Sequence, residues 1–177
     1  MKIIRHLILT TIFFGYIFAL SEVKIGYVDS QQIITQFEGF RLVQIELEKE
    51  QKRLEADYVT LANQLDSLFQ VYEKQKLLMS EDRRLEKENE LTQKQRELQE
   101  FEMKNFGPQN SELVKLQNQL LKPVLKLFSD ACDTIGKKRQ FDYILDAGTG
   151  GILYSIEANN ITEEVIEEMN EMAATSQ

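Results

Sequence analysis

The chain has 177 residues, of which 28% are charged and 42% hydrophobic, with only 8 glycines and 2 prolines. This balance favours long helices over a compact mixed core. The formal net charge is −8, and the basic residues alternate with acidic ones along the chain. Because nucleic-acid binding needs a basic surface, nucleic acid is not an expected partner.

The N-terminal 21 residues have the pattern of a secretory signal peptide. A short basic start precedes the apolar run 7–20, and small residues lie near its end. An uncleaved membrane anchor is the alternative, although 14 apolar residues fall short of the roughly 20 needed to span a bilayer. We therefore expect residues 1–21 to be a cleaved signal peptide that exports the chain. Cleavage after Ala19 and cleavage after Ser21 both fit the pattern.

Export changes the set of reactive side chains. Cleavage of the signal peptide removes His6, the only histidine. It leaves 19 basic and 29 acidic residues, a net charge of −10. Without an imidazole, the usual general base near neutral pH is missing. Cys132 is the single cysteine, so it has neither a histidine partner nor a disulfide partner in the chain. We predict no enzyme activity and no cofactor or metal. Cys132 is expected to be a small buried helix residue, with a reactive or intermolecular thiol as the alternative.

Residues 22–39 are predicted to begin a small body. The segment Val23–Val28 is short and rich in β-branched residues, which predicts a strand. Asp29 and Ser30 close it, and Ser30 is expected to cap a short helix.

Residues 40–122 are predicted to form a long antiparallel helical hairpin, or tentacle. Six apolar residues are spaced alternately by four and three positions, which is typical of a coiled-coil seam. These seam residues are Leu54, Tyr58, Leu61, Leu65, Leu68 and Tyr72. Ser80, followed by two acidic residues, predicts the start of the second arm and therefore places the tip.

The register of the hairpin follows from pairs of apolar residues. If the chain folds back near Ser80, residues that face each other have numbers with a constant sum. Five pairs sum to 159 or 160: Leu68 with Leu91, Leu61 with Leu98, Tyr58 with Phe101, Leu54 with Phe106, and Leu47 with Leu113.

Two prolines are expected to shape the second arm. Gly107-Pro108 predicts a kink or local break, after which Asn110-Ser111 restarts the helix. Pro123 lies where the arms should meet the body, and it is predicted to bend the helix there.

Residues 123–177 are predicted to complete the body with a helix, a β-hairpin and a C-terminal helix. The apolar runs 141–146 and 152–156 are joined by a glycine-rich loop, which predicts the β-hairpin. Thr162 is expected to cap the last helix. The predicted fold class is α+β, mainly α, with a long antiparallel coiled-coil hairpin on a small β-rich body that forms the oligomer core.

The apolar residues beyond the seam predict two interaction surfaces. A two-helix hairpin has one shared face, so other apolar side chains on it remain exposed. We expect them to bind a protein partner, with contact to the arm of a neighbouring copy or plain exposure to water as the alternatives. The candidate partner-binding residues are Phe69, Leu77, Leu78, Met79, Phe101, Met103 and Phe106. Three short strands cannot form a stable sheet alone, so several copies are expected to associate through them. The candidate interface residues are Ile25, Tyr27, Phe141, Tyr143, Leu145 and Leu153.

Several segments support a resemblance to a known family over about residues 23–170. In chain order they are Lys24-Ile25-Gly26-Tyr27-Val28-Asp29, Leu121-Lys122-Pro123-Val124, Phe141-Asp142-Tyr143-Ile144-Leu145-Asp146, Ile152-Leu153-Tyr154, Ile161-Thr162-Glu163-Glu164-Val165-Ile166 and Met169-Asn170. With the hairpin between them, the chain resembles the Skp/OmpH family of periplasmic chaperones. The resemblance implies a periplasmic homotrimer that holds unfolded outer-membrane proteins between helical tentacles without ATP. A coiled-coil scaffold of the cell envelope is the alternative.

The charge distribution departs from that family's pattern. Well-known members are basic, whereas residues 40–139 hold 18 basic and 18 acidic side chains, and residues 140–177 hold eight acidic and no basic ones. Long-range attraction of acidic partners should therefore be weak or reversed. We do not extend the family's lipid or lipopolysaccharide binding to this chain.

Overall fold

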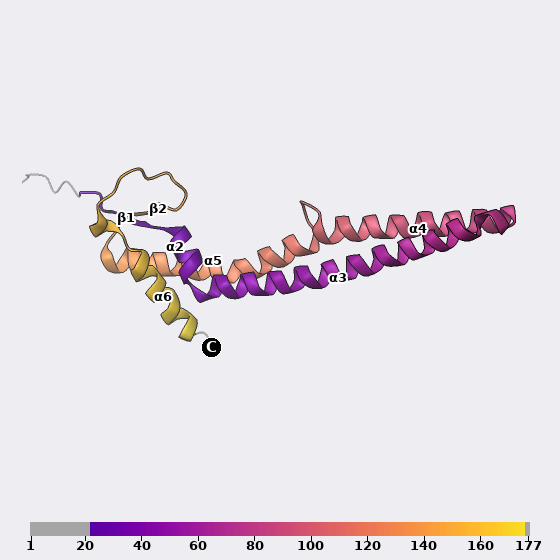
Figure 1. The fold of residues 1–177 in the computed structure, drawn as a ribbon. Helices are drawn as coiled ribbons and strands as arrows, with labels where there is room; N and C mark the ends of the chain where they lie inside the picture. Colours follow the sequence, from indigo (N-terminus) through magenta and orange to yellow (C-terminus); the bar gives the residue numbers. More distant parts are fainter. Residues whose placement is uncertain (1–21, 176–177) are drawn as a thin grey trace, which may run out of the picture.

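The computed structural model describes residues 22–175 as a small body from which a long helical hairpin projects (Figure 1). The predicted fold class, α+β and mainly α with a long helical hairpin on a small body, is confirmed. The predicted signal peptide, residues 1–21, lies outside the described residues. Within residues 22–175, no helix combines the length and the apolar character needed to cross a membrane.

The two arms form where the seam pattern predicts them. Helix α3, Glu38–Gln75, is 38 residues long, or about 57 Å at 1.5 Å per residue. A short 3₁₀ turn, η1, Lys76–Leu78, ends it. Ser80 has an extended backbone and immediately precedes α4, Glu81–Phe106. The tip therefore lies where the sequence predicts it.

The second arm contains the predicted break. Helix α4 ends at Phe106, and α5, Glu112–Arg139, begins after Ser111, whose hydroxyl accepts a hydrogen bond from the Val114 N–H at 3.4 Å. The intervening residues form a loop that protrudes from the arm (Figure 1). Asn110 in this loop has a φ of 58°, in the left-handed region that asparagine tolerates better than most residues. Helix α5 continues through Pro123 into the body without ending there.

The core of the body is formed by the C-terminal half of α5 together with β1, Ile25–Val28, α2, Ser30–Gln36, and α6, Thr162–Thr175. The side chains of this core are all at most 7% exposed: Val28, Ile33, Phe37, Ala131, Ile135, Ile161, Val165, Ile166 and Met169. Helix α6 packs on α5 and α2, with Val165, Ile166 and Met169 turned into the core.

The predicted β-hairpin is wrong. Strand β2, Tyr143–Asp146, pairs in parallel with β1, so that Ile25 lies opposite Tyr143 and Val28 opposite Asp146. Residues 152–156 form no strand, and the short 3₁₀ turn η2, Glu157–Asn159, follows them. The sheet of the described body therefore has two parallel strands, which are separated in sequence by the whole hairpin.

The glycine-rich loop turns at residues 147–150 but packs on α2 instead of joining two paired strands. Oδ1 of Asp146 accepts hydrogen bonds from the N–H groups of Ser30, at 3.2 Å, and Gly148, at 2.9 Å. A side chain at Gly148 would lie 2.5 Å from Oγ of Ser30, so only glycine fits this close approach. Local sequence predicted a turn here, but contacts with residues more than a hundred positions away decide the path of the loop.

Two predicted helix caps are also corrected. Asp29, not Ser30, caps α2, because its Oδ1 accepts from the N–H groups of Gln31 and Gln32 at 2.9 and 3.1 Å. Thr162 is the first residue of α6, and its hydroxyl accepts from the Asp29 N–H at 2.9 Å. Thr162 therefore connects the last helix to the end of β1.

Candidate binding surfaces

Contacts across the seam of the hairpin follow the predicted register near the tip but not at Tyr58, whose predicted partner is Phe101. Leu54 is only 4% exposed. The ring of Tyr58 packs edge-on against Phe106, with centroids 6.5 Å apart. Near the tip the hydroxyl of Tyr72 donates a hydrogen bond to Glu88, which raises the pKa of Tyr72. The numbers of this last pair sum to 160, as the register requires.

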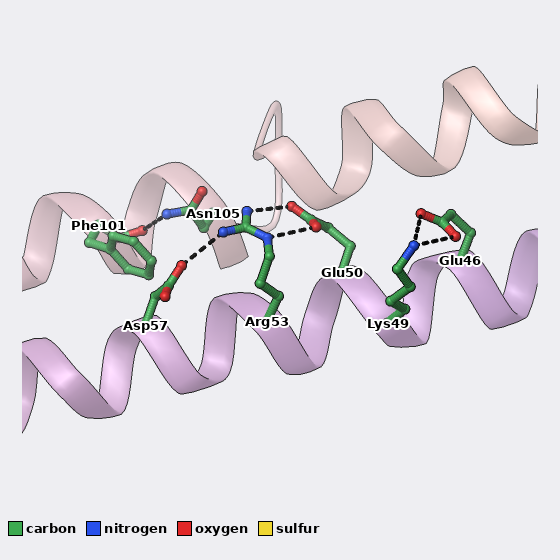
Figure 2. A network of polar contacts seen from close by, with 7 residues as sticks. All are labelled: Glu46, Lys49, Glu50, Arg53, Asp57, Phe101 and Asn105. Carbon is green, nitrogen blue, oxygen red and sulfur yellow. Dashed lines mark hydrogen bonds and ion pairs between the residues drawn. The ribbon is translucent and has the colours of Figure 1, made fainter.

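Polar groups on the arms beside the break mostly satisfy one another (Figure 2). The amide Nδ2 of buried Asn105 donates to the carbonyl of Phe101 at 2.9 Å. On α3, Arg53 bonds Glu50 at 2.7 and 2.9 Å and Asp57 at 2.8 Å. The hydrogen bond from Arg53 lowers the pKa of Glu50. These exposed pairs stabilise α3 modestly.

One flank of the hairpin contains two open hollows between α3 and α4. The distal hollow, near the tip, has a volume of about 760 Å³. It is lined by Ala62, Leu65, Asp66, Phe69, Tyr72, Glu73, Lys76, Glu88, Leu91, Thr92, Gln95 and Leu98. The proximal hollow, of about 430 Å³, is lined by Glu55, Tyr58, Val59, Glu102 and Phe106. We call the two hollows together the arm groove.

The spacing of the groove residues explains why they share one flank. On α3 they include six positions that each follow a seam residue and are spaced alternately by four and three residues. These positions are Glu55, Val59, Ala62, Asp66, Phe69 and Glu73. The arm groove therefore extends the seam sideways, and its apolar floor is continuous with the packed interface.

The outer face of the small sheet is the second apolar surface. Alternation along the strands places Ile25, Tyr27, Tyr143 and Leu145 on one face, opposite the face that contributes Val28 to the core. Of these four, Ile25, Tyr143 and Leu145 are exposed and Tyr27 is half-buried. The apolar side of the sheet is thus uncovered in the single chain.

Comparison with known proteins identifies the family. The family model described as outer membrane protein (OmpH-like) matches residues 24–169. The chain belongs to this family. Among solved structures, a candidate outer membrane chaperone (OmpH-like) from Caulobacter crescentus CB15 has a TM-score of 0.74 and 13% sequence identity, over 85% of this chain and 86% of that chain. At this identity the likeness supports the fold alone. A search of curated proteins found no match.

Membership of the OmpH-like family confirms the predicted resemblance. The seven residues that the sequence nominated for partner binding divide into two groups in the structure. Leu77 and Leu78 at the tip are 91% and 90% exposed, and Phe69 and Met103 are also exposed. The other three, Met79, Phe101 and Phe106, are half-buried.

The half-buried aromatic residues pack within the hairpin. Phe101 contacts Phe106, with ring centroids 6.4 Å apart, and Phe106 contacts Tyr58. Phe69 and Phe106 line the arm groove, whereas Leu77, Leu78 and Met103 lie outside it. The sequence prediction missed Val59, which is exposed in the groove. Its position directly after seam residue Tyr58 is the signal that would have identified it.

The six predicted interface residues also differ in their surroundings. Leu153 is 98% exposed and, like Ile25, Tyr143 and Leu145, is free to meet another chain. Phe141 instead packs on its own chain, because its ring lies 3.2 Å from the position that a Cβ of Gly26 would occupy. The ammonium group of Lys24 also lies over this ring, 4.7 Å from its centroid. Phe141 therefore belongs partly to the core of its own body.

Cys132 is a half-buried residue of α5 beside the body core. Burial, together with the charge of Asp146, raises the pKa of its thiol to about 11. A thiol with so high a pKa is rarely ionised near neutral pH, and the thiolate is the reactive form. The geometry therefore favours the structural interpretation of Cys132 over the reactive one.

Proposed function

We propose that the mature chain is an ATP-independent holdase of the periplasm that binds unfolded outer-membrane proteins and prevents their aggregation. The observation that supports this most strongly is the set of large apolar side chains exposed on the arms, above all Phe69, Leu77 and Leu78. A stable two-helix hairpin does not need them, and exposed apolar groups of this kind mark binding surfaces.

The uncovered sheet in the body supports an oligomer, which we propose to be a trimer. A two-stranded sheet is too small to be stable without further cover, and Ile25, Tyr143 and Leu145 remain exposed on it. Association through the bodies would gather several hairpins around one client. Weak contacts on tethered arms then add up, because each bound site raises the effective concentration at the next.

The test combines light scattering with an aggregation assay. Residues 22–177 should form a stable oligomer and, without nucleotide, should keep a denatured β-barrel outer-membrane protein soluble after dilution from urea. The double variant Leu77→Ser, Leu78→Ser should remain folded but hold the client less well. The matched control Gln70→Ser, Gln99→Ser changes two exposed polar residues of the same arms and should hold it normally.

A monomer that does not suppress aggregation would contradict the proposal. It would leave the coiled-coil scaffold of the cell envelope as the better hypothesis. Equal holding by the tip variant and its control would show that the exposed leucines are not the client-binding surface.

A further inference from the structure

We propose that the arm groove selects unfolded segments in which apolar side chains are flanked by lysine or arginine. The inference rests on the proposed function and adds a preference among clients to it. It depends on three observations: the apolar floor of the groove, the charges on its rim and the different charge balance on the opposite flank.

The floor of the groove can accept apolar side chains. Phe69 and Val59 are half-exposed there, and Leu65, Leu91 and Leu98 are only partly buried by the packing of the two arms. Covering such surface is favourable by about 25 cal/mol for each Å² of apolar area removed from water. The two hollows follow each other along the hairpin, so an extended chain can place successive side chains in them.

The rim of the groove is acidic. Its charged residues are Glu55, Asp66, Glu73, Glu88, Glu102 and Lys76. Nζ of Lys76 lies 2.8 Å from Oε2 of Glu73 and balances its charge, and Nε of Arg84 lies 3.9 Å from Oε1 of Glu88. Over the described residues 22–175, none of the ion pairs involves the other three acids.

Those three free carboxylates are distributed along the whole groove. Glu55 and Glu102 lie on opposite arms at the proximal hollow, and Asp66 lies at the distal one. Glu55 and Asp66 accept hydrogen bonds only from the neutral amides of Gln51 and Gln70, each at 2.8 Å. Their negative charge therefore remains available to a cationic side chain of a bound segment.

The opposite flank of α4 has no such excess. There Glu90 and Glu97 each come one position before an apolar seam residue, which turns them away from the groove. Lys87 bonds Glu90 at 2.5 Å, and Lys94 bonds Glu97 at 2.6 Å. The arms as a whole are neutral, so the acidic character is a property of the groove side rather than of the hairpin.

The matching ligand is an extended segment whose apolar residues enter the hollows while its basic side chains reach the rim. One contact between unit charges near 4 Å in water changes affinity by roughly fivefold. Exposed charges are screened by salt over about 10 Å at 0.1 M. The preference for basic segments should therefore weaken with salt, whereas the apolar part of the binding should persist.

Two labelled peptides of equal length test the inference by fluorescence anisotropy. They have the same apolar residues, alternating with lysine in one and with glutamate in the other. At low salt the native chain should bind the lysine peptide at least about fivefold more tightly. The double variant Glu55→Gln, Glu102→Gln should reduce this ratio at least about twofold. Phe69→Ser should weaken both peptides and leave the ratio unchanged.

A matched control separates the rim from the net charge of the protein. Glu86→Gln, Glu100→Gln removes the same charge from exposed positions of α4 that do not line the groove, and it should leave the ratio unchanged. Equal affinity for both peptides, an unchanged ratio in the rim variant, or an equal fall in the control would overturn the inference. If the native chain still suppresses client aggregation, that failure leaves the holdase proposal intact.

Discussion

The body and the hairpin are stabilised in different ways. The body has a compact core in which residues from four elements, among them Ile33, Ala131, Val165 and Met169, have almost no contact with solvent. The hairpin has a narrow seam in which only a few residues, such as Leu54 and Tyr72, are buried. A residue of the body core is packed on all sides, whereas a residue of the seam has open hollows beside it.

The difference follows from the number of elements that meet in each region. Two helices share a single line of contact, so most of their surface remains available for other molecules. Several elements can enclose a common core. The same chain thus places its packing in the body and its exposed apolar surface on the arms, and each of the following experiments tests that division.

The largest effect is expected in the body. Met169→Ala removes a side chain with 0% exposure, so it should lower the free energy of unfolding by about 2–5 kcal/mol. Urea denaturation followed by circular dichroism, at constant protein concentration, measures the change. Glu171→Ala, at an exposed position of the same helix, should stay within about 0.5 kcal/mol of the native chain. An equal loss in both variants would mean that α6 does not depend on core packing.

The reactivity of the Cys132 thiol tests how tightly the body is packed. Because its pKa is raised from 9.0 to about 11, alkylation at about pH 8 should be about a hundredfold slower in the native chain than in concentrated urea. The neutral thiol is the form that the fold favours. The raised pKa of the thiol therefore contributes fully to the free energy of unfolding below pH 9.0. This contribution is lost as the pH rises through about 11. Similar rates with and without urea, followed by mass spectrometry, would contradict the half-buried position.

A smaller and more local effect is expected in the hairpin. Leu54→Ala should cost about 2 kcal/mol, at the low end of the usual range, because water can enter the space from the neighbouring hollow. Hydrogen exchange should accelerate in α3 and α4 while the body core remains protected. Val59→Ala, at the exposed position beside the seam, is the control and should change exchange little. Equal acceleration in the body would show that the two regions unfold as one unit.

Much of the hairpin was predictable because its determinants are local. The alternating spacing of Leu54 through Tyr72, the helix start after Ser80 and the break at Gly107-Pro108 each depend on a few neighbouring residues. The arms then need only one register, and residue numbers that sum to a constant predict it. Chain direction and helical periodicity suffice for such a structure.

The body required the tertiary structure, because its contacts join residues far apart in sequence. Residues 141–146 have the pattern of a strand, but nothing local shows that their partner is β1 rather than residues 152–156. Asp146 and Gly148 settle this by binding the start of α2. Phe141 likewise looked like an interface residue until its packing beside Gly26 was known.

The arm groove was only partly predictable from the sequence. The sequence by itself determined a neutral hairpin with surplus apolar residues, and it nominated Phe69 and Phe106 among them. Only the tertiary structure showed that these two residues line the same flank as Glu55, Asp66 and Glu102. The physical reason is that charge balance along a sequence is an average over both flanks, whereas a ligand meets only the flank that it contacts.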